Sequence, residues 1–450
     1  MKLSDLAQKL GCQYHGADCE FHSVSIDSRR IVPGQLFVAI VGERFDAHHF
    51  LQEAQRAGAI AALVDRCIET ELPIIQVANT RRALGQLAQL HRNNFSIPTV
   101  ALTGSCGKTT TRAMLESVLS ECGIVLASKR SFNNEIGVPL TLLDLNAKHQ
   151  FAVLELGANH PGEIAYLSNL VQPIVALITN IGPAHLQGFG SLEGVARAKF
   201  EIFSGLKKGG TAIVNTQDPS SQHWCKLIRN HPIIGFGDNA EFSAHQIQID
   251  ANGYPCFLLH TPLGSIDIRL SLVGQHNILN ALACAAAAQQ IGASLENIKA
   301  GLEKVSALPG RFLMRTGKHG ARIIDDTYNA NPASVKAALA LLARYPGQRY
   351  FVLGTMGELG EQSLFYHEKM GQLAQTHQID QLFTYGAFAK ETADAFGKNA
   401  HHFTDQRALI AALQSELAAD KTILIKGSRS MRMENVVAAL IDPSELNGLN

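Results

Sequence analysis

The stretch Thr99-Val-Ala-Leu-Thr-Gly-Ser-Cys-Gly-Lys-Thr-Thr-Thr111 decides how the rest of the chain is interpreted. A short apolar run and a glycine loop precede Ala113 to Glu121, where apolar residues recur at helical spacing, so we expect a strand, a loop and a helix. Such glycines let backbone N–H groups approach phosphate oxygens, the helix dipole and the lysine favour the anion, and the hydroxyl can bind magnesium. The stretch therefore predicts a nucleotide triphosphate site formed by Gly104, Ser105, Gly107, Lys108, Thr109 and Thr110.

The spacing of this loop is shorter than the usual one. The pattern G-x-x-x-x-G-K-[ST] would require glycine where Leu102 stands, so the loop is G-x-x-G-K-T. The alternative is a tight turn followed by a solvated helix lysine, but the flanking strand and helix favour phosphate binding. Cys106 lies inside the loop, and we favour a small residue that fits there over a redox role.

Composition limits the classes of function. A chain of 450 residues exceeds what one hydrophobic core normally serves, so about three domains are expected. Lys+Arg and Asp+Glu balance at 39 each, which provides no overall field for nucleic acid or anionic membranes. Residues 1–10 lack the apolar core of a signal peptide, and the run Ala281 to Ala288 is too short to span a bilayer. We expect a cytoplasmic enzyme with no nucleic acid partner and no stable membrane insertion.

The eight cysteines form no C-x-x-C pair, which fits reduced thiols and neither a disulfide framework nor a zinc site.

Residues 1–80 have the pattern of a small α/β unit. Loops that follow its expected strands contain Ser28, Arg29, Asp46 and His48, and ligands are commonly held in such loops. Ser28 and Arg29 can take a phosphate or a uracil edge, whereas a local ion pair between Asp27 and Arg30 is an equally good interpretation. Residues 80–93 are expected to form a connecting helix.

The central region, residues 81–308, alternates apolar strands with helices. The expected strands span residues 100–103, 151–156, 174–179 and 211–214. Such runs predict a parallel sheet covered on both faces, with ligands at the carboxyl ends of its strands. Shorter alternating segments between residues 240 and 273 are expected to add antiparallel strands to the edge of this sheet.

Polar residues occur where these strands end. Glu155 closes an apolar strand and needs a partner if it is buried, which magnesium held by Thr109 would supply. His185 follows another strand, and Lys199 lies on a helix; taken alone, each has a structural or surface interpretation. Asn277 and Asn280 share one helix face and can contact an adenine edge, although capping would also explain the first of them.

The last region, residues 309–450, is expected to be a second doubly wound domain, with strands at residues 322–325, 350–353, 382–385 and 422–425. The loop Lys426-Gly-Ser-Arg429 suggests a second anion site, because a strand end, a glycine and two cations converge there; plain surface charge is the alternative.

Taken together and in order, these motifs resemble the Mur ligase family of peptidoglycan precursor enzymes across essentially the whole chain. The most specific stretches are Ser131-Phe-Asn-Asn-Glu-Ile-Gly-Val-Pro139, Glu155-Leu-Gly-Ala-Asn159, Asp326-Thr-Tyr-Asn-Ala-Asn331 and the Leu-Gly-x-Met-Gly-Glu-Leu-Gly run that ends at Gly360. No Asp-Asn-Pro-Arg motif, typical of the diaminopimelate- or lysine-adding members, occurs in the sequence.

The resemblance implies roles for individual residues. Lys108, Lys199 and His185 would be catalytic, with Thr109, Glu155, His185 and a carbamate on Lys199 as ligands of two Mg²⁺ ions. Asn277 and Asn280 would contact the adenine of ATP, Arg311 its phosphates and Asp326 its ribose. The UDP-linked and peptide substrates would be held by Ser28, Arg29, Asp46, His48, Asn133, Asn134, Asn159, Tyr328, Asn331 and Arg429.

The implied reaction is ATP-dependent joining of D-alanyl-D-alanine to UDP-N-acetylmuramoyl-tripeptide. Phosphorylation of the carboxylate gives an acyl phosphate that an uncharged amine can attack. Residues 1–80 would bind UDP, residues 81–308 ATP and residues 309–450 the dipeptide, in a monomer whose domains close together. The alternatives are another Mur-type or folylpolyglutamate-type ligase and, from a different class, a nucleotide-switch NTPase.

Overall fold

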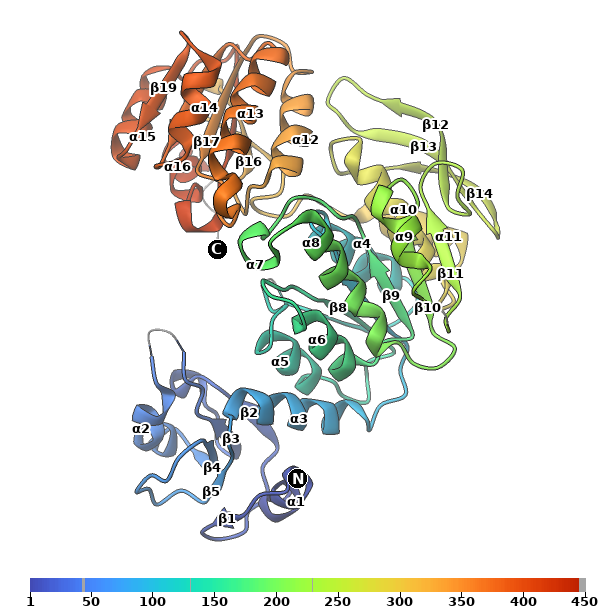
Figure 1. Cartoon of the computed structure of the whole chain (residues 1–450), viewed down its shortest axis with the longest axis vertical. Coiled ribbons are helices and arrows are strands. Elements are labelled where there is room, and N and C mark those ends of the chain that lie inside the picture. The colour runs from blue at the N-terminus through green and yellow to red at the C-terminus, as the bar shows by residue number, and fades with distance from the viewer. Residues whose placement is uncertain (43–44, 130, 229, 445–450) are drawn as a thin grey trace.

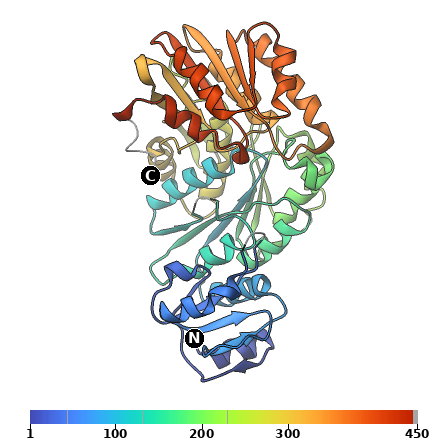
Figure 2. The same cartoon turned by 90° about the vertical axis from the view of Figure 1, so that its left-hand side faces the viewer.

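The computed structural model describes residues 1–42, 45–129, 131–228 and 230–444. Three sheet-containing parts follow one another along the long axis of the molecule in chain order (Figures 1 and 2). This arrangement confirms the predicted α/β class with three parts built around mainly parallel sheets. Within the described residues, no helix combines the length and apolar character needed to cross a membrane.

The N-terminal sheet has the strand order β1-β5-β4-β3-β2, and only β1 is antiparallel to its neighbour. The strands are β1 (Tyr14–His15), β2 (Ser23–Ser25), β3 (Gln35–Val38), β4 (Ala59–Val64) and β5 (Ile74–Gln76). Alternation along β3 places Leu36 in a core with helices α1 (Leu3–Leu10) and α3 (Thr80–Arg92), and Phe37 in a core with α2 (Leu51–Arg56). Both faces of the sheet are therefore covered.

Helix α3 connects the first sheet to the second, as predicted. Three of its side chains belong to the core of the N-terminal sheet: Ala83, Leu84 and Leu87. The same helix packs on α5 (Gly137–Leu143) and α6 (Glu163–Val171) of the central part. At its C-terminal end the buried Arg92 donates hydrogen bonds to the carbonyls of Phe95 and Val171. These contacts fix where the central part begins.

The central sheet is parallel throughout, with the order β11-β10-β9-β6-β8-β7. Its strands are β6 (Thr99–Thr103), β7 (Val125–Ala127), β8 (Phe151–Glu155), β9 (Val175–Ile178), β10 (Thr211–Asn215) and β11 (Ile233–Phe236). One face packs on α4 (Lys108–Ser120), α10 (His276–Gln289) and α11 (Leu295–Lys304), and the other on α5, α6 and α8 (Leu192–Phe200). Two short helices, α7 (Leu186–Phe189) and α9 (Pro219–Cys225), complete this part. Burial on both faces explains the nearly unbroken apolar runs.

The antiparallel strands after residue 240 do not extend the parallel sheet, so that expectation is wrong. They form a separate three-stranded sheet of β12 (Ser243–Ile249), β13 (Pro255–Thr261) and β14 (Gly264–Arg269). The apolar face of this sheet, with Phe257, Leu259 and Ile268, shares a core with helices α10 and α11. An isolated bridge pairs Phe236 of β11 with Phe242, the residue before β12. These strands therefore bury their apolar face against helices α10 and α11 and do not pair with the edge of the parallel sheet.

The C-terminal sheet has the order β15-β16-β20-β17-β18-β19, with β15 alone antiparallel. The strands are β15 (Leu313–Thr316), β16 (Arg322–Asp326), β17 (Gln348–Gly354), β18 (Gln381–Tyr385), β19 (Ala400–Phe403) and β20 (Lys421–Lys426). The helices are α12 (Pro332–Leu342), α13 (Ser363–Thr376), α14 (Ala389–Phe396), α15 (Gln406–Ser415) and α16 (Glu434–Leu440). Helices α12 and α13 pack on one face, and α15 and α16 on the other. The predicted doubly wound arrangement is present.

Candidate active site

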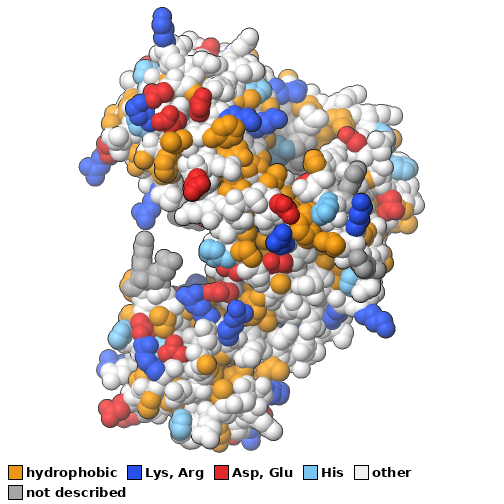
Figure 3. Space-filling view, in the orientation of Figure 1, with side chains coloured by type: hydrophobic (Ala, Val, Ile, Leu, Met, Phe, Trp, Pro, Cys, Tyr) orange, Lys and Arg blue, Asp and Glu red, His pale blue; other side chains and the backbone are white. Residues whose placement is uncertain are grey.

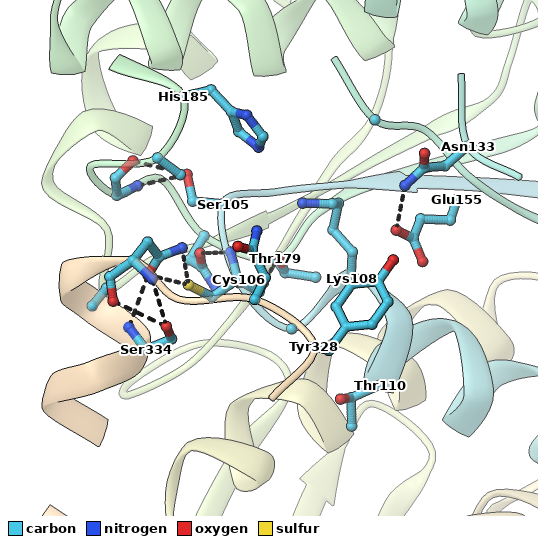
Figure 4. A pocket seen from close by; sticks show the side chains of 18 of the residues that line it. Ser105, Cys106, Lys108, Thr110, Asn133, Glu155, Thr179, His185, Tyr328 and Ser334 are labelled. Atoms are coloured by element: carbon cyan, nitrogen blue, oxygen red, sulfur yellow. Dashed lines mark hydrogen bonds between the residues drawn. The ribbon is translucent and has the colours of Figure 1, made fainter. Parts of the chain in front are cut away.

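A cavity of about 1060 Å³ lies where the carboxyl ends of the central strands meet loops of the C-terminal sheet. Fifteen of the predicted site residues line it, namely Ser105, Gly107, Lys108, Thr110, Asn133, Asn134, Glu155, Asn159, His185, Asn277, Asn280, Arg311, Asp326, Tyr328 and Asn331. Figure 4 shows the side chains of Lys108, Glu155 and His185, which come from the start of α4, the end of β8 and the residue before α7. The structure thus gathers most of the predicted nucleotide, metal and peptide residues in one place.

The phosphate loop is held in shape by residues that follow β9. The backbone N–H of Cys106 donates to Oδ1 of Asn180 at 2.9 Å, and the hydroxyl of Thr179 donates to the Cys106 carbonyl at 2.7 Å. Gly104 and Gly107 have φ angles of +152° and +79°, which favour glycine. Helix α4 begins at Lys108, so its N-terminus faces the loop as predicted.

Lys108 and Glu155 form the charged floor of the cavity. The Lys108 ammonium donates to the Gly104 carbonyl at 2.6 Å, and Asn133 donates to Glu155 Oε1 at 2.9 Å. Burial lowers the pKa of Lys108, while the Glu155 carboxylate opposes that shift. The buried hydroxyl of Thr109 accepts from Nη2 of Arg311 at 3.3 Å. A cation, a carboxylate and a hydroxyl therefore meet beside the loop.

Lys199 is not a surface lysine. It lies on α8 with 1% of its surface exposed, and Nζ has no hydrogen-bonding partner among the described residues. Burial, assisted by the positive charge of Lys108, lowers the pKa of Lys199 to about 7. The neighbouring Phe200 points to Phe203 and Trp224, with ring centroids at 5.5 and 5.7 Å. Nζ lies 5.7 Å from the centroid of the Phe189 ring, but a buried amine without a hydrogen-bonding partner still requires an explanation.

His185 precedes α7 with a left-handed φ of 54°. Its Nδ1 lies 2.7 Å from Oε2 of Glu358, although the ring N–H is not directed along that line. The histidine lowers the pKa of Glu358 by this contact, against the effect of burial. Glu358 belongs to the loop after β17, so the C-terminal sheet contributes a carboxylate to the cavity.

Asn277 and Asn280 form one buried pair on α10. The Asn280 amide donates to Oδ1 of Asn277 at 2.9 Å, and the Asn277 amide donates to the Val273 carbonyl at 2.8 Å. Gln275 is the N-cap of the helix, so Asn277 does not cap it. A Cβ atom built on Gly107 would lie 2.3 Å from Oδ1 of Asn280, which shows how closely this pair abuts the phosphate loop.

The C-terminal part places Arg311 over the ring of Tyr328, with 4.1 Å between its guanidinium carbon and the ring centroid. Asn331 caps α12 by accepting from Ser334 N, and its side-chain amide lies 3.3 Å from the sulfur of Cys106. This contact joins the phosphate loop to the C-terminal part of the chain.

The two cations of the predicted second anion site at residues 426–429 are both paired within the chain. The ammonium of the buried Lys426 is paired with Asp326 Oδ2 at 2.7 Å and also donates to the Asn329 carbonyl at 2.8 Å. Arg429 is paired with Glu434 at 2.8 Å. Both cations are thus neutralised within the chain, and Lys426 instead fixes the carboxylate of Asp326.

The predicted N-terminal residues lie outside the cavity lining, and an indentation of the surface separates the N-terminal part from the C-terminal part (Figure 3). Ser28 donates to Glu53 at 3.1 Å. Asp27 pairs with Arg29 at 2.8 Å, so the expected ion pair with Arg30 has the wrong arginine.

Asp46 and His48 belong to a polar cluster in the same N-terminal part. The two imidazole nitrogens of the buried His48 lie 2.6 Å from Asp46 and 3.2 Å from Asp65. Burial would raise the pKa of Asp46, but hydrogen bonds from His48 and Arg66 hold it well below its usual range.

Several residues of the site were not predicted. Arg81 and Arg82 of α3 line the cavity together with Tyr166, over whose ring Arg82 lies at 4.2 Å. Glu358 also lines it. Glu358 lies in the specific run that ends at Gly360, although no role was predicted for it. The two arginines of the predicted helix gave no such signal.

The donors present suit Mg²⁺ better than a metal that needs a complete protein cage. Within the described ranges, no three His, Cys, Asp or Glu side chains cluster as ligands. Mg²⁺ takes one or two protein carboxylates and completes its shell with waters and substrate phosphates. Glu155, Thr109 and His185 around a phosphate loop fit that requirement, and Nζ of the buried Lys199 has no hydrogen-bonding partner among the described residues.

Comparison with protein families matches three segments of the chain. Residues 20–92 match the description "Mur ligase family, catalytic domain", residues 102–288 "Mur ligase middle domain" and residues 310–429 "Mur ligase, glutamate ligase domain". UDP-N-acetylmuramoyl-tripeptide–D-alanyl-D-alanine ligase of Escherichia coli K12 is 45% identical over 97% of this chain and 98% of its own. The Bacillus subtilis 168 ligase of the same name is 35% identical over 94% and 93%.

Solved structures agree with these matches. A crystal structure of MurF from Acinetobacter baumannii has a TM-score of 0.92 and 38% identity over 97% of both chains. MurF from Thermotoga maritima, crystallised with ADP, has a TM-score of 0.84 and 29% identity over 93% of this chain and 96% of its own. With three family segments in order and relatives covering nearly its full length, the chain belongs to the Mur ligase family.

Proposed function

We propose that this chain joins D-alanyl-D-alanine to the terminal carboxylate of UDP-N-acetylmuramoyl-tripeptide and converts ATP to ADP and phosphate. The observation that carries the proposal is the one cavity in which the phosphate loop, Glu155, His185 and loops of the C-terminal sheet converge. Relatives named for this reaction cover almost the whole chain, which supports the choice of substrates.

ATP would lie along the phosphate loop. Gly104, Ser105, Gly107, Lys108, Thr109 and Thr110 would hold its phosphates, because their N–H groups and hydroxyls surround the start of α4. Asn277 and Asn280 would contact adenine, and the close approach of Asn280 to Gly107 supports that placement. Arg311 would reach the phosphates from beside Thr109, and Asp326, held by Lys426, would accept from the ribose.

Glu155, Thr109 and His185 would hold two Mg²⁺ ions, and carbamylation of Lys199 would add an oxygen donor. An uncharged amine is the form that captures CO2, and burial favours that form of Lys199. The neutral Nζ would form a bond to the carbon of CO2 and release one proton, which leaves a carbamate anion that a metal and Lys108 can balance. Bound there, the metal ions would neutralise charge on the transferred phosphoryl group.

The chain's own residues would position the two substrates. Lys108 would follow the transferred phosphoryl group as the substrate carboxylate becomes an acyl phosphate. Asn133, Asn134, Asn159, Tyr328 and Asn331 line the cavity where the peptide arm and incoming amine would meet, and Arg429 would approach from the loop after β20. Enclosure would keep water from hydrolysing the acyl phosphate.

The UDP end would bind to residues 1–80 through Ser28, Arg29, Asp46 and His48, with residues 81–308 holding ATP and residues 309–450 the dipeptide. Arg29 is now paired with Asp27, and His48 with Asp46. These pairs would either rearrange when the substrate binds or hold the side chains in place for it. We place the reaction in the cytoplasm, with a monomer as the active form.

The test is phosphate release from ATP with UDP-N-acetylmuramoyl-tripeptide and D-alanyl-D-alanine, each omitted in turn. We expect release only with all three present, together with a new amide product detected by mass spectrometry. Release that does not depend on the dipeptide would favour a nucleotide switch and would contradict the proposal. A preference for diaminopimelate or glutamate as the amine would indicate another ligase of this family.

A further inference from the structure

Glu358 belongs to the Leu-Gly-x-Met-Gly-Glu-Leu-Gly run that ends at Gly360, but the sequence assigned no role to this side chain. It lies in the loop after β17, between Gly357, whose N–H donates to Ser428 Oγ at 2.6 Å, and Leu359, which is buried. About half of its side-chain surface is exposed, and it faces the cavity. It lines the same cavity as Lys108 of the phosphate loop.

Two independent contacts connect this loop to the segment that contains His185. The Glu358 carboxylate lies 2.7 Å from Nδ1 of His185, and the Glu358 carbonyl accepts from the N–H of Gln187 at 3.0 Å. Both His185 and Glu358 have left-handed backbone conformations, with φ of 54° and 64°. Non-glycine residues adopt this conformation rarely, and it persists where the surroundings determine it.

Nδ1 lies within ion-pair distance of Glu358 without the angle of a hydrogen bond, and His185 lines the cavity. Figure 4 shows its ring and the Lys108 ammonium directed toward the same space. A histidine that binds a metal commonly donates its second ring N–H to a carboxylate, which fixes the tautomer and the ring orientation.

We propose that Glu358 is a positioning residue that holds His185 through Nδ1 and so presents an unprotonated Nε2 to the cavity. In taking His185 as a metal ligand, this inference rests on the proposed function. The carboxylate comes from the C-terminal sheet and the imidazole from the central part. The His185 side of the site is therefore complete only when these two parts are docked as they are here.

The first experiment reads the tautomer of His185 in the metal-free, full-length protein. Long-range ¹H–¹⁵N spectra of ¹⁵N-histidine-labelled protein at alkaline pH would be compared for wild type, Glu358→Ala, Glu358→Gln and Glu361→Ala, with His185→Gln to assign the signal. Glu361 is exposed in the same region and serves as the matched control. We expect the Nδ1–H form in wild type, its loss in Glu358→Ala and its retention in Glu358→Gln, whose amide oxygen still accepts.

The second experiment measures Mn²⁺ binding in the presence of ADP by electron paramagnetic resonance. We expect the weaker-bound ion to lose about 10- to 100-fold in affinity in Glu358→Ala and much less in Glu358→Gln and Glu361→Ala. An unchanged His185 tautomer in Glu358→Ala would overturn the inference. So would equal losses in Glu358→Ala and Glu358→Gln, because charge alone would then explain the effect. If the tautomer shifts while no ligase activity exists, the proposed function fails and the positioning role stands.

Discussion

Lys199→Met should stabilise the metal-free protein while abolishing its activity. The lysine has 1% of its surface exposed and no hydrogen-bonding partner for Nζ among the described residues, and methionine has a similar length without the charge. Activity should be lost because methionine cannot form a carbamate. A functional group that costs stability is expected at such a site.

The size of the effect follows from the pKa. Burial lowers the pKa of Lys199 from 10.5 to about 7, so between these values the unfolded chain binds a proton that the folded chain does not. Stability therefore rises with pH across this window, and the penalty is complete below the folded pKa. The shift corresponds to a penalty of about 4 to 5 kcal/mol at pH 6, which falls to about 2 kcal/mol at pH 9. Methionine removes it at every pH.

The measurement is urea unfolding in CO2-free buffer with chelator at pH 6 and pH 9. Trp224 is the chain's one tryptophan, and its ring lies 5.7 Å from that of Phe200, so its fluorescence reports unfolding of this region. Lys208→Met, at an exposed position, is the control and should change stability little at either pH. A gain for Lys199→Met that is absent at pH 6, or no smaller at pH 9, would refute the reasoning.

Two further substitutions test the nucleotide site. Gly107→Ala should raise the ADP dissociation constant, measured by calorimetry, at least about tenfold, because φ is +79° and the new Cβ would meet Asn280 Oδ1 at 2.3 Å. The control is Gly162→Ala, which has a similar φ of +86° but open space around the new Cβ, and it should leave the dissociation constant unchanged. Equal effects of the two substitutions would contradict this explanation. Lys426→Met should lower the free energy of unfolding by about 3 kcal/mol, since it leaves the Asp326 carboxylate unpaired. Adding Asp326→Asn should recover part of that loss in thermal unfolding.

The parallel strands and the phosphate loop were predictable because they depend on local sequence. Nearly unbroken apolar runs report burial on both faces, and the glycines at 104 and 107 report a backbone that other residues seldom adopt. The strands after residue 240 were recognised by their alternation. The helices that cover this sheet were not predicted, because alternation shows that one face of a strand is buried without showing what covers it.

Pairing between distant charges was the part that sequence could not supply. The sequence predicted a basic loop with Lys426 and Arg429, but in the fold these cations are paired with Asp326 and Glu434. The sequence alone allowed Lys199 to be a surface residue, whereas the structure shows that it is buried. Glu358 meets His185 only because two sheets dock, and no local pattern encodes that contact.

The cysteine of the phosphate loop also gives the molecule a built-in chemical label. The Cys106 thiol is half-buried, 3.3 Å from the amide of Asn331, whereas Cys67 is exposed on the N-terminal part. A nucleotide on the loop would shield the first and leave the second untouched. The ratio of alkylation at these two cysteines, read by mass spectrometry, would therefore report the fraction of occupied molecules in a mixture without a labelled nucleotide.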